Sequence, residues 1–404
     1  MEIVPILSAL KRNKVGALLI GFQIALTLAI VCNALFIISN RVERMHRPTG
    51  IDEANIFTLA NEFIGDPPDL KALVQNDLAA LRALPGVVDA YATNSLPLRG
   101  GGWSSGLDLQ PQQKHSTAPT TLYYADDHAL NTLGAKLSAG RWFNADEIGD
   151  YHDSDTNVPP VIVVTQALGK KLFPDSDALG KTVYMDNQPT RIIGLVERTQ
   201  TPWVSSSWGE SFVENSTFLP YRIVTSSMSI VVRAKPGQLD AVMKSAEQTL
   251  FKQNRNRVIT HLEPFAEIRE RAYRNDRAMA LLLGTVCVLL LGVTAFGIVG
   301  LTSFWVAQRR RQIGVRRALG ARKRDILRYF QTENLVIALT GAAVGVALAV
   351  GANLWMVSHY ELARMGFGFV LAGAGTVLVL GQLSVLWPAL RAASIPPALA
   401  TRAA

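Results

Sequence analysis

Few residues of this 404-residue sequence have the types and spacing that catalysis requires. Gly180-Lys181-Thr182 matches the end of a phosphate-binding P-loop, but Asp175 stands where that loop needs its first glycine. The six histidines are scattered, without the HExxH pattern or the paired spacing of a zinc site. The acidic segment 144–157 lacks the spacing and the final glutamate of an EF-hand loop, so we interpret it as a solvated loop. The sequence predicts no catalytic residue, no bound cofactor and no metal site in this chain.

A dense group of basic residues offers a different chemistry, the binding of anions or of an acidic partner. In the segment 308–330 nine residues are Lys or Arg, and one residue, Asp325, is acidic. Four of the arginines recur in two pairs at seven-residue spacing, which predicts a basic stripe along one face of a helix. These are Arg309 with Arg316, and Arg310 with Arg317.

A small apolar face of Val315, Ala318 and Leu319 accompanies this stripe. Gly320 can end the helix, because glycine readily takes the left-handed conformation after a last helical turn, and the segment 322–327 starts the next helix. These residues alone leave two interpretations equally open. The segment either sets the membrane topology and contacts lipid head groups, or it docks a soluble partner.

Four windows without any Lys, Arg, Asp or Glu predict the elements that position this segment. They cover 15–40, 278–308, 334–360 and 365–390, and each exceeds the ~20 residues with which a helix crosses the hydrocarbon core. The first window is too long for the apolar core of a signal peptide, and Cys32 does not follow the small residue that a lipoprotein cleavage site requires. The sequence therefore predicts an α-helical membrane protein with four transmembrane helices.

The distribution of charge predicts the orientation of the chain. Residues 1–14, 309–333 and 391–404 together carry 14 Lys or Arg and 3 Asp or Glu, whereas 41–277 carries 25 basic and 28 acidic residues. Lys and Arg concentrate on short cytoplasmic loops of membrane proteins. We therefore expect a cytoplasmic N-terminal helix (1–14), coupling loop (309–333) and tail (391–404), with a large domain outside. The basic net charge follows from these loops, so no nucleic-acid partner is expected.

The outer domain at 41–277 alternates strand-like and helix-like patterns. It has no cysteine, so it has to rely on its own hydrophobic core. We expect this domain between the first and second transmembrane helices to have an α/β part, formed by about 50–100 and 210–265, and a β-rich part at about 101–209 that is inserted between those two segments. The clearest expected elements are strands at 55–63, 87–98, 159–165, 190–196, 227–234 and 257–262 and helices at 69–84 and 238–252.

The segment after this domain has the character of a helical stalk. Between Pro264 and Gly284 no Pro or Gly interrupts it, so one helix could run from Pro264 to Arg311, a length of roughly 70 Å. Such a stalk would connect the outer domain rigidly to the coupling loop. Two i,i+4 ion pairs in the favourable order are expected on it, Glu267 with Arg271 and Glu270 with Arg274.

The predicted spans contain no acid or strong base, which counts against a proton- or ion-coupled carrier. In the third span, small residues recur at four-residue steps. This pattern predicts close packing against a neighbouring helix. The residues are Gly341, Gly345, Ala349 and Asn353.

Several segments together resemble the MacB/FtsX-like ABC transporter permeases that have a MacB-type periplasmic domain. Residues 9–21 resemble the opening of that family, and 128–147 and 163–196 resemble the signatures of its outer domain. Residues 311–330 are similar to its inner loop, and 388–402 to its C-terminal tail. The resemblance extends over most of the chain.

In this family the inner loop binds a separate ATPase subunit, so the resemblance implies an ATPase-coupling interface in this chain. Gln308 and Gln312 depart from the family pattern, which usually has Glu at both positions, and the change removes two negative charges beside the basic stripe. The implied interface residues are Arg309, Arg310, Gln312, Ile313, Gly314, Arg316, Arg317, Ala318, Leu319, Gly320, Ala321, Arg322 and Asp325.

The resemblance also implies a function, that of the permease subunit of an ABC-type exporter. Such permeases dimerise, as homodimers or with a paralogous chain, and transmit the ATP-driven closure of a cytoplasmic ABC ATPase dimer to their periplasmic domains. This mechanotransmission drives efflux or export of a periplasmic substrate. ATP and Mg are expected in the separate ATPase chain, because this sequence has no fused ATPase domain.

The implied location is the bacterial inner membrane, with both termini in the cytoplasm and the large domain in the periplasm. Membrane lipid is one expected partner, and the MacB branch of the family adds a periplasmic adaptor and an outer-membrane exit duct. Two alternatives stay open. One is extraction of lipoproteins from the inner membrane, and the other is a non-transporting signal relay that regulates envelope enzymes or a sensor kinase.

Overall fold

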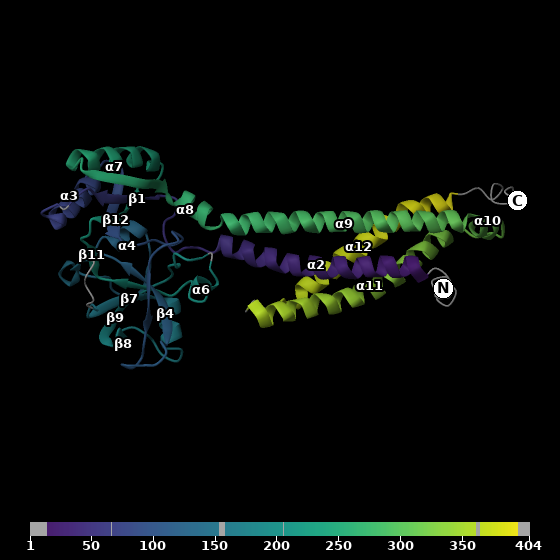
Figure 1. Ribbon diagram of the computed structural model, residues 1–404, viewed down its shortest axis with the longest axis horizontal. Helices are drawn as coiled ribbons and strands as arrows, with labels where there is room; N and C mark the ends of the chain where they lie inside the picture. Colours follow the sequence, from purple (N-terminus) through teal and green to yellow (C-terminus); the bar gives the residue numbers. More distant parts are fainter. Residues whose placement is uncertain (1–13, 66, 153–157, 205, 361–363, 395–404) are drawn as a thin grey trace. The chain divides into compact units, whose positions relative to one another are not determined.

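The computed structural model describes the chain in two compact units (Figure 1). The first, which we call the helical unit, comprises Met1–Met45 and Asp276–Ala404, and the second, the sheet unit, comprises His46–Asn275. The predicted N-terminal helix at 1–14 and most of the predicted tail lie outside the described residues. The described ranges are 14–65, 67–152, 158–204, 206–360 and 364–394.

Four long helices in the helical unit confirm the four predicted spans, because each is long and apolar enough to cross a membrane. Two begin earlier than predicted. The second starts at Arg274 instead of 278, and the third starts at Lys323, so the predicted coupling loop at 309–333 shortens to 309–322. The helices are α2 (Lys14–His46), α9 (Arg274–Gln308), α11 (Lys323–Tyr360) and α12 (Phe367–Ala393).

The small residues of α11 allow its backbone to approach α2, as the sequence predicts. A Cβ atom added at Gly341 would lie 2.7 Å from the carbonyl oxygen of Gly21, so a larger residue there would clash. Asn33 on α2 donates a hydrogen bond to the carbonyl oxygen of Ala349 at 3.1 Å. Close contact and one interhelical hydrogen bond therefore hold α2 against α11.

The α/β part of the sheet unit contains a four-stranded antiparallel sheet in the order β13-β1-β12-β2. Helices α3 (Leu70–Arg82) and α7 (Leu239–Gln253) pack on this sheet, and Phe57, Leu78 and Leu250 share one buried core. The pattern expected at each of these elements is confirmed. The strands are β1 (Ile56–Phe63), β2 (Val87–Thr93), β12 (Ser227–Ala234) and β13 (Arg257–Pro264).

The β-rich part contains a seven-stranded sheet in the order β3-β4-β10-β7-β9-β5, with β8 paired to β9. Its strands are β3 (Trp103–Leu107), β4 (Ala118–Tyr124), β5 (Leu137–Gly140), β7 (Val161–Thr165), β8 (Thr182–Met185), β9 (Gln188–Val196) and β10 (Ser216–Leu219).

The predicted boundary of the β-rich part at 209 is too early. Strand β10 pairs in parallel with β4, and β11 (Tyr221–Ile223) pairs with β6 (Gly149–Tyr151), so both belong to the inserted part. The insertion therefore ends after β11, and the α/β part resumes at β12. Short helices α4 (Ala129–Leu133), α5 (Gln166–Leu172) and α6 (Ser207–Glu210) and the 3-10 helix η1 (Ala145–Glu147) complete the described elements of the insertion.

The predicted continuous stalk helix is wrong, because the chain breaks at Tyr273 between α8 (Phe265–Ala272) and α9. Tyr273 has φ −101° and ψ 11°, and its buried hydroxyl donates to Gln200 Oε1 at 3.3 Å. The guanidinium of Arg269 lies 5.6 Å from the centre of its ring. These contacts within the sheet unit stabilise a conformation that an uninterrupted helix does not have.

Helix α8 is part of the sheet unit and packs through buried Phe265 and Ile268. The expected ion pairs of the stalk differ accordingly. Among the described residues, Arg271 pairs with Glu263 instead of Glu267. The break at Tyr273 places Glu270 and Arg274 on different helices, so the i,i+4 geometry expected for them does not exist.

Candidate functional site

The predicted coupling segment forms a short helix, α10 (Arg310–Ala318), between α9 and α11. The backbone of Arg309 leaves the helical conformation, with φ −96° and ψ 10°, and so separates α10 from α9. Gly320 has a φ of +99° after the last turn, as the sequence predicts. Asp325 accepts a hydrogen bond from the backbone N–H of Arg322 at 2.9 Å and thereby stabilises the start of α11.

One face of α10 is buried within the helical unit. Ile313 and Gly314 are both buried, and Ile313 packs in one cluster with Ile326 and Phe330 of α11 and with Ala392 of α12. Two of the residues expected to contact an ATPase therefore hold α10 in place. A partner would meet the opposite face of this helix.

The predicted basic stripe is wrong for two of its four arginines, because Arg309 and Arg317 bond within the chain. Arg309 Nη1 lies 2.9 Å from Glu333 Oε2, and the two side chains are 13% and 2% exposed. Arg317 donates to the carbonyl oxygen of Ala393 at the end of α12. Arg309 lies at the break before α10 and so does not share a helix with Arg316, whereas Arg310 and Arg317 both lie on α10.

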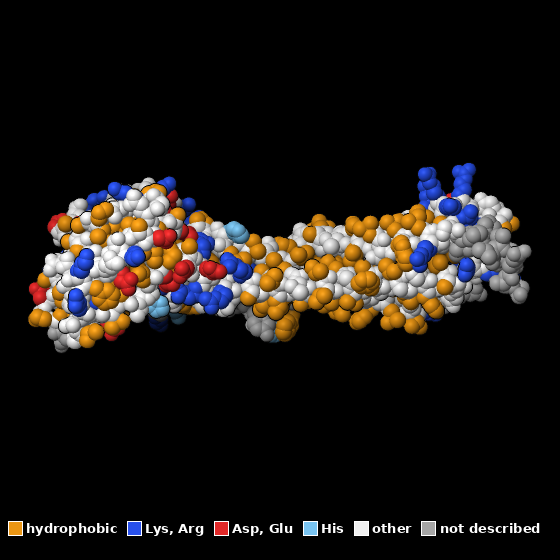
Figure 2. All heavy atoms as spheres, turned by 90° about the horizontal axis from the view of Figure 1, so that it is seen from above, with side chains coloured by type: hydrophobic (Ala, Val, Ile, Leu, Met, Phe, Trp, Pro, Cys, Tyr) orange, Lys and Arg blue, Asp and Glu red, His pale blue; other side chains and the backbone are white. Residues whose placement is uncertain are grey.

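Apart from the half-buried Ala321, the remaining predicted residues join Arg311 and Val315 in a mixed basic and apolar surface, which we call the coupling surface. Leu319 is 84% exposed and Val315 is 45% exposed. Figure 2 shows Lys and Arg side chains projecting at the α10 end of the helical unit, beyond helices covered with apolar side chains. The exposed members are Arg310, Arg311, Gln312, Val315, Arg316, Ala318, Leu319, Gly320, Arg322 and Asp325.

The cations of this surface have few partners in the chain itself. Arg316 lies 5.2 Å from the centre of the Tyr329 ring. Arg310, Arg311 and Arg322 form no side-chain ion pair with any described residue. Unpaired guanidinium groups beside an exposed leucine can bind an acidic protein surface that has an apolar pocket, or lipid head groups. The residues of the coupling surface include no nucleophile or acid–base pair for catalysis.

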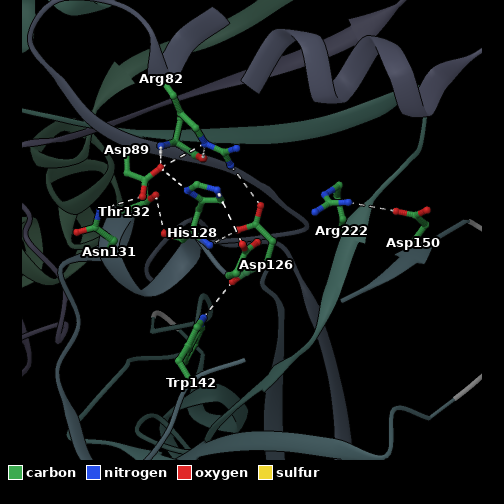
Figure 3. A network of polar contacts seen from close by, with 11 residues as sticks. Arg82, Asp89, Asp126, His128, Asn131, Thr132, Trp142, Asp150 and Arg222 are labelled. Carbon is green, nitrogen blue, oxygen red and sulfur yellow. Dashed lines mark hydrogen bonds and ion pairs between the residues drawn. The ribbon is translucent and has the colours of Figure 1, made fainter. Parts of the chain in front are cut away.

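A second polar cluster, the inter-sheet junction, was not predicted (Figure 3). Arg82 of α3 lies 3.3 Å from Asp89 of β2 and 3.4 Å from Asp126, which follows β4. His128 Nδ1 and Asn131 Nδ2 each lie 2.9 Å from an oxygen of Asp89. These contacts connect the four-stranded sheet to the insertion. The contacts between the two parts join residues 39 to 44 positions apart, a separation that no sequence pattern signals.

Burial gives the junction a distinctive electrostatic property. It raises the pKa of Asp126 to about 6, although the positive charges of Arg82 and His128 oppose the shift. The carboxylate is 1% exposed, and the Trp142 indole donates to the Asp126 backbone carbonyl at 3.0 Å. We interpret the junction as a structural clamp. Across the residues that the structure describes, no group of three or more His, Cys, Asp or Glu could hold a metal ion.

Two family models match the chain, one mainly over the sheet unit and the other within the helical unit. The model of the MacB-like periplasmic core domain matches residues 24–249, which is more than half of the chain. The model of the FtsX-like permease C-terminal domain matches residues 284–397. The second match includes α10 and the whole coupling surface.

Curated proteins similar to this chain include several that are named MacB. The macrolide export ATP-binding/permease protein MacB of Chromobacterium violaceum is 28% identical over 65% of this chain and 40% of its own length. The MacB protein of an Escherichia coli strain is 26% identical over 85% of this chain and 51% of its own length. The chain thus spans about half the length of these relatives or less.

Two solved structures match parts of the chain. The periplasmic region of MacB from Actinobacillus actinomycetemcomitans is 20% identical, with a TM-score of 0.34, over 57% of this chain and 97% of that region. The extracellular domain of the noncanonic ABC-type transporter YknZ is 14% identical, with a TM-score of 0.32, over 50% of this chain.

Proposed function

Because the chain belongs to the family of MacB/FtsX-like permeases, we propose that it is the permease subunit of an ABC-type exporter that works by mechanotransmission. In this proposal a cytoplasmic ABC ATPase binds the coupling surface and moves α10 as it closes on ATP. The movement passes along α9 to the periplasmic sheet unit and drives efflux or export of a periplasmic substrate. ATP and Mg are bound by the ATPase, and this chain contributes no catalytic residue.

The observation that carries the proposal is the exposed, unpaired character of the coupling surface. Leu319 and Val315 are exposed beside arginines that form no ion pair with described residues, and α10 itself is held firmly through Ile313. A surface of this kind gains stability when a complementary partner covers it. Helix α9 adjoins it and has 35 residues, which gives a length of about 52 Å at 1.5 Å per residue.

Other partners complete the proposed assembly. The apolar side chains of α9 are strongly exposed, for example Phe296 at 79%, and suit membrane lipid or a second permease chain. We propose that two permease chains flank one ATPase dimer. We also propose that the periplasmic domain works with an adaptor and an outer-membrane duct, because the matched relatives are macrolide exporters.

Substitution of Leu319 by glutamate tests the docking step. Leu319→Glu places a negative charge on the apolar centre of the coupling surface, so we expect the amount of ATPase that co-purifies with the tagged full-length chain to fall at least about tenfold. Mass spectrometry would identify the captured ATPase, and hydrolysis of ATP by the purified complex would be measured. Leu319 is a better target than Arg317, because replacement of Arg317 also removes the bond to Ala393.

A matched leucine serves as the control. Leu109 is 38% exposed in the sheet unit, so Leu109→Glu adds the same charge away from the coupling surface and should leave ATPase capture unchanged. Equal ATPase capture by Leu319→Glu and by the unmodified chain would refute docking at this surface. A captured ATPase without any export defect on its loss would favour the signal-relay alternative.

A further inference from the structure

A cleft of about 290 Å³ lies between the two larger sheets of the sheet unit, and the proposed function gives it no role. Its floor consists of Ala60, Ser229 and Thr93, which are neighbours across three adjacent strands of the four-stranded sheet. These side chains are small, so they leave space above the sheet. The volume lies near the lower end of the ~300–1,000 Å³ typical of small-molecule sites.

The opposite wall of the cleft is aromatic. Tyr124 of β4 and Tyr151 of β6 have ring centres 4.5 Å apart, and Trp103 of β3 is 57% exposed. Aromatic walls bind flat, apolar groups by stacking and by burial of surface. The hydroxyl of Thr93 donates to the carbonyl oxygen of Tyr124 at 2.9 Å, so floor and wall are connected at one end of the cleft.

A half-buried arginine, Arg99, lines the same cleft. Its guanidinium donates to Thr58 Oγ1 at 3.3 Å and forms no ion pair with any described residue. Glu263, whose charge acts on Arg99, pairs instead with Arg271. Burial lowers the pKa of Arg99 from its ordinary value, and an anion in the cleft would oppose that shift. Several N–H groups of this guanidinium therefore stay available to a ligand.

The backbone beside Arg99 is held in an unfavourable conformation. Leu98 is buried and has a φ of +66°, which a leucine rarely adopts. Hydrogen bonds keep it there, from Leu98 N–H to the carbonyl oxygen of Thr201 at 3.3 Å and from Gly100 N–H to that of Pro202 at 3.0 Å. Strain of this kind occurs where the surrounding structure fixes a functional side chain. Here it fixes the turn that carries Arg99.

We propose that this cleft binds a small aromatic carboxylate, with the carboxylate on Arg99 and the ring against Trp103 and Tyr124. A guanidinium can bind a carboxylate through two parallel hydrogen bonds, which gives both affinity and orientation. Ser229 on the floor offers a hydroxyl for a further bond. The proposal does not depend on ATPase docking or on export.

Direct binding to the full-length chain in lipid nanodiscs tests this site. The probe is 2-naphthoate, measured by titration calorimetry, and its neutral analogue 2-naphthamide is the matched control ligand. We expect saturable one-to-one binding of the carboxylate with a Kd of about 1 mM or tighter. The amide should bind at least about tenfold more weakly, because it cannot form the charged pair with Arg99.

Three variants locate the site. Arg99→Gln should weaken binding of 2-naphthoate about tenfold and abolish the preference over the amide. Arg191→Gln, which removes an exposed arginine elsewhere in the sheet unit, should bind as the unmodified chain does. Ala60→Met fills space at the floor of the cleft and leaves Arg99 in place, so it should also weaken binding of 2-naphthoate. This variant tests the site even if Arg99→Gln fails to fold. Unsaturable binding up to about 10 mM, or equal binding by Ala60→Met, would overturn the proposal.

Discussion

Arg257 of the sheet unit and Arg311 of the coupling surface carry the same guanidinium in opposite surroundings. Arg257 is fully buried and lies 2.7 Å and 2.9 Å from the two carboxylate oxygens of Asp77, and it also donates to Asn61 at 3.1 Å. Its guanidinium lies 5.0 Å from the centre of the Phe63 ring. Arg311 is exposed and forms no ion pair with any described residue.

The contrast shows how the two units use positive charge. In the sheet unit, arginines such as Arg257 and Arg82 connect elements of the fold, and removal of either would leave a buried carboxylate without its partner. On the coupling surface the chain leaves its cations to solvent or to a partner. Substitution of arginines in the sheet unit should therefore lower the stability of the fold, and substitution of arginines on the coupling surface should weaken partner binding.

The largest effect is expected at the buried pair of Arg257. Asp77→Asn leaves the charge of Arg257 buried without a counter-ion, which costs about 3–5 kcal/mol of the free energy of unfolding. Amide hydrogen exchange of the full-length chain should show reduced protection in β1 and β13. The exposed Asp240 on α7 provides the matched control, since Asp240→Asn should cost less than about 0.5 kcal/mol. Unchanged protection in Asp77→Asn would show that the pair contributes little.

A smaller, pH-dependent effect is expected at the inter-sheet junction. Because the pKa of Asp126 is about 6 in the folded chain and near 4 when unfolded, the folded chain binds more protons between these values. Stability contributed by this group is therefore present below pH 4 and is lost as the pH rises to 6. The groups that face Asp126 are Arg82, His128 and Asp127.

Asp126→Asn removes this titration. Relative to the variant, the unmodified chain should lose on the order of 2 kcal/mol of opening free energy in β2 and β4 between pH 4 and pH 6. Hydrogen exchange of both proteins at each pH measures the difference and cancels the intrinsic dependence of exchange on pH. The same pH dependence in both chains would contradict the raised pKa.

Local patterns in the sequence were sufficient to predict most of the helices and strands. The alternation at 55–63 predicts β1, and the absence of charge in four windows predicts the four long helices, because these patterns reflect which face or which length is buried. The glycine at 320 predicts the end of α10. These features depend on neighbours in the sequence, so a single chain reveals them.

Features that depend on distant contacts were missed or wrong. The break at Tyr273 depends on Gln200, and the place of β10 in the insertion depends on pairing with β4. In the candidate site, Arg309 and Arg316 look equivalent in sequence, yet Arg309 pairs with Glu333. Charge at a position can be read from sequence, whereas the partner that neutralises it cannot.

The smallest effect on stability, and the sharpest test of the contrast, is expected at the coupling surface. Arg311→Gln with Arg322→Gln removes two exposed cations that form no ion pair with described residues, so the free energy of unfolding should change by less than about 0.5 kcal/mol. The affinity of this double variant for the ATPase identified in the docking experiment should nevertheless fall severalfold. This loss of affinity should become smaller at higher salt, because salt screens the charges. Arg191→Gln in the sheet unit should change neither quantity. If the double variant were destabilised as strongly as Asp77→Asn while ATPase binding stayed intact, these arginines would serve the fold, and the division between the two units would be wrong.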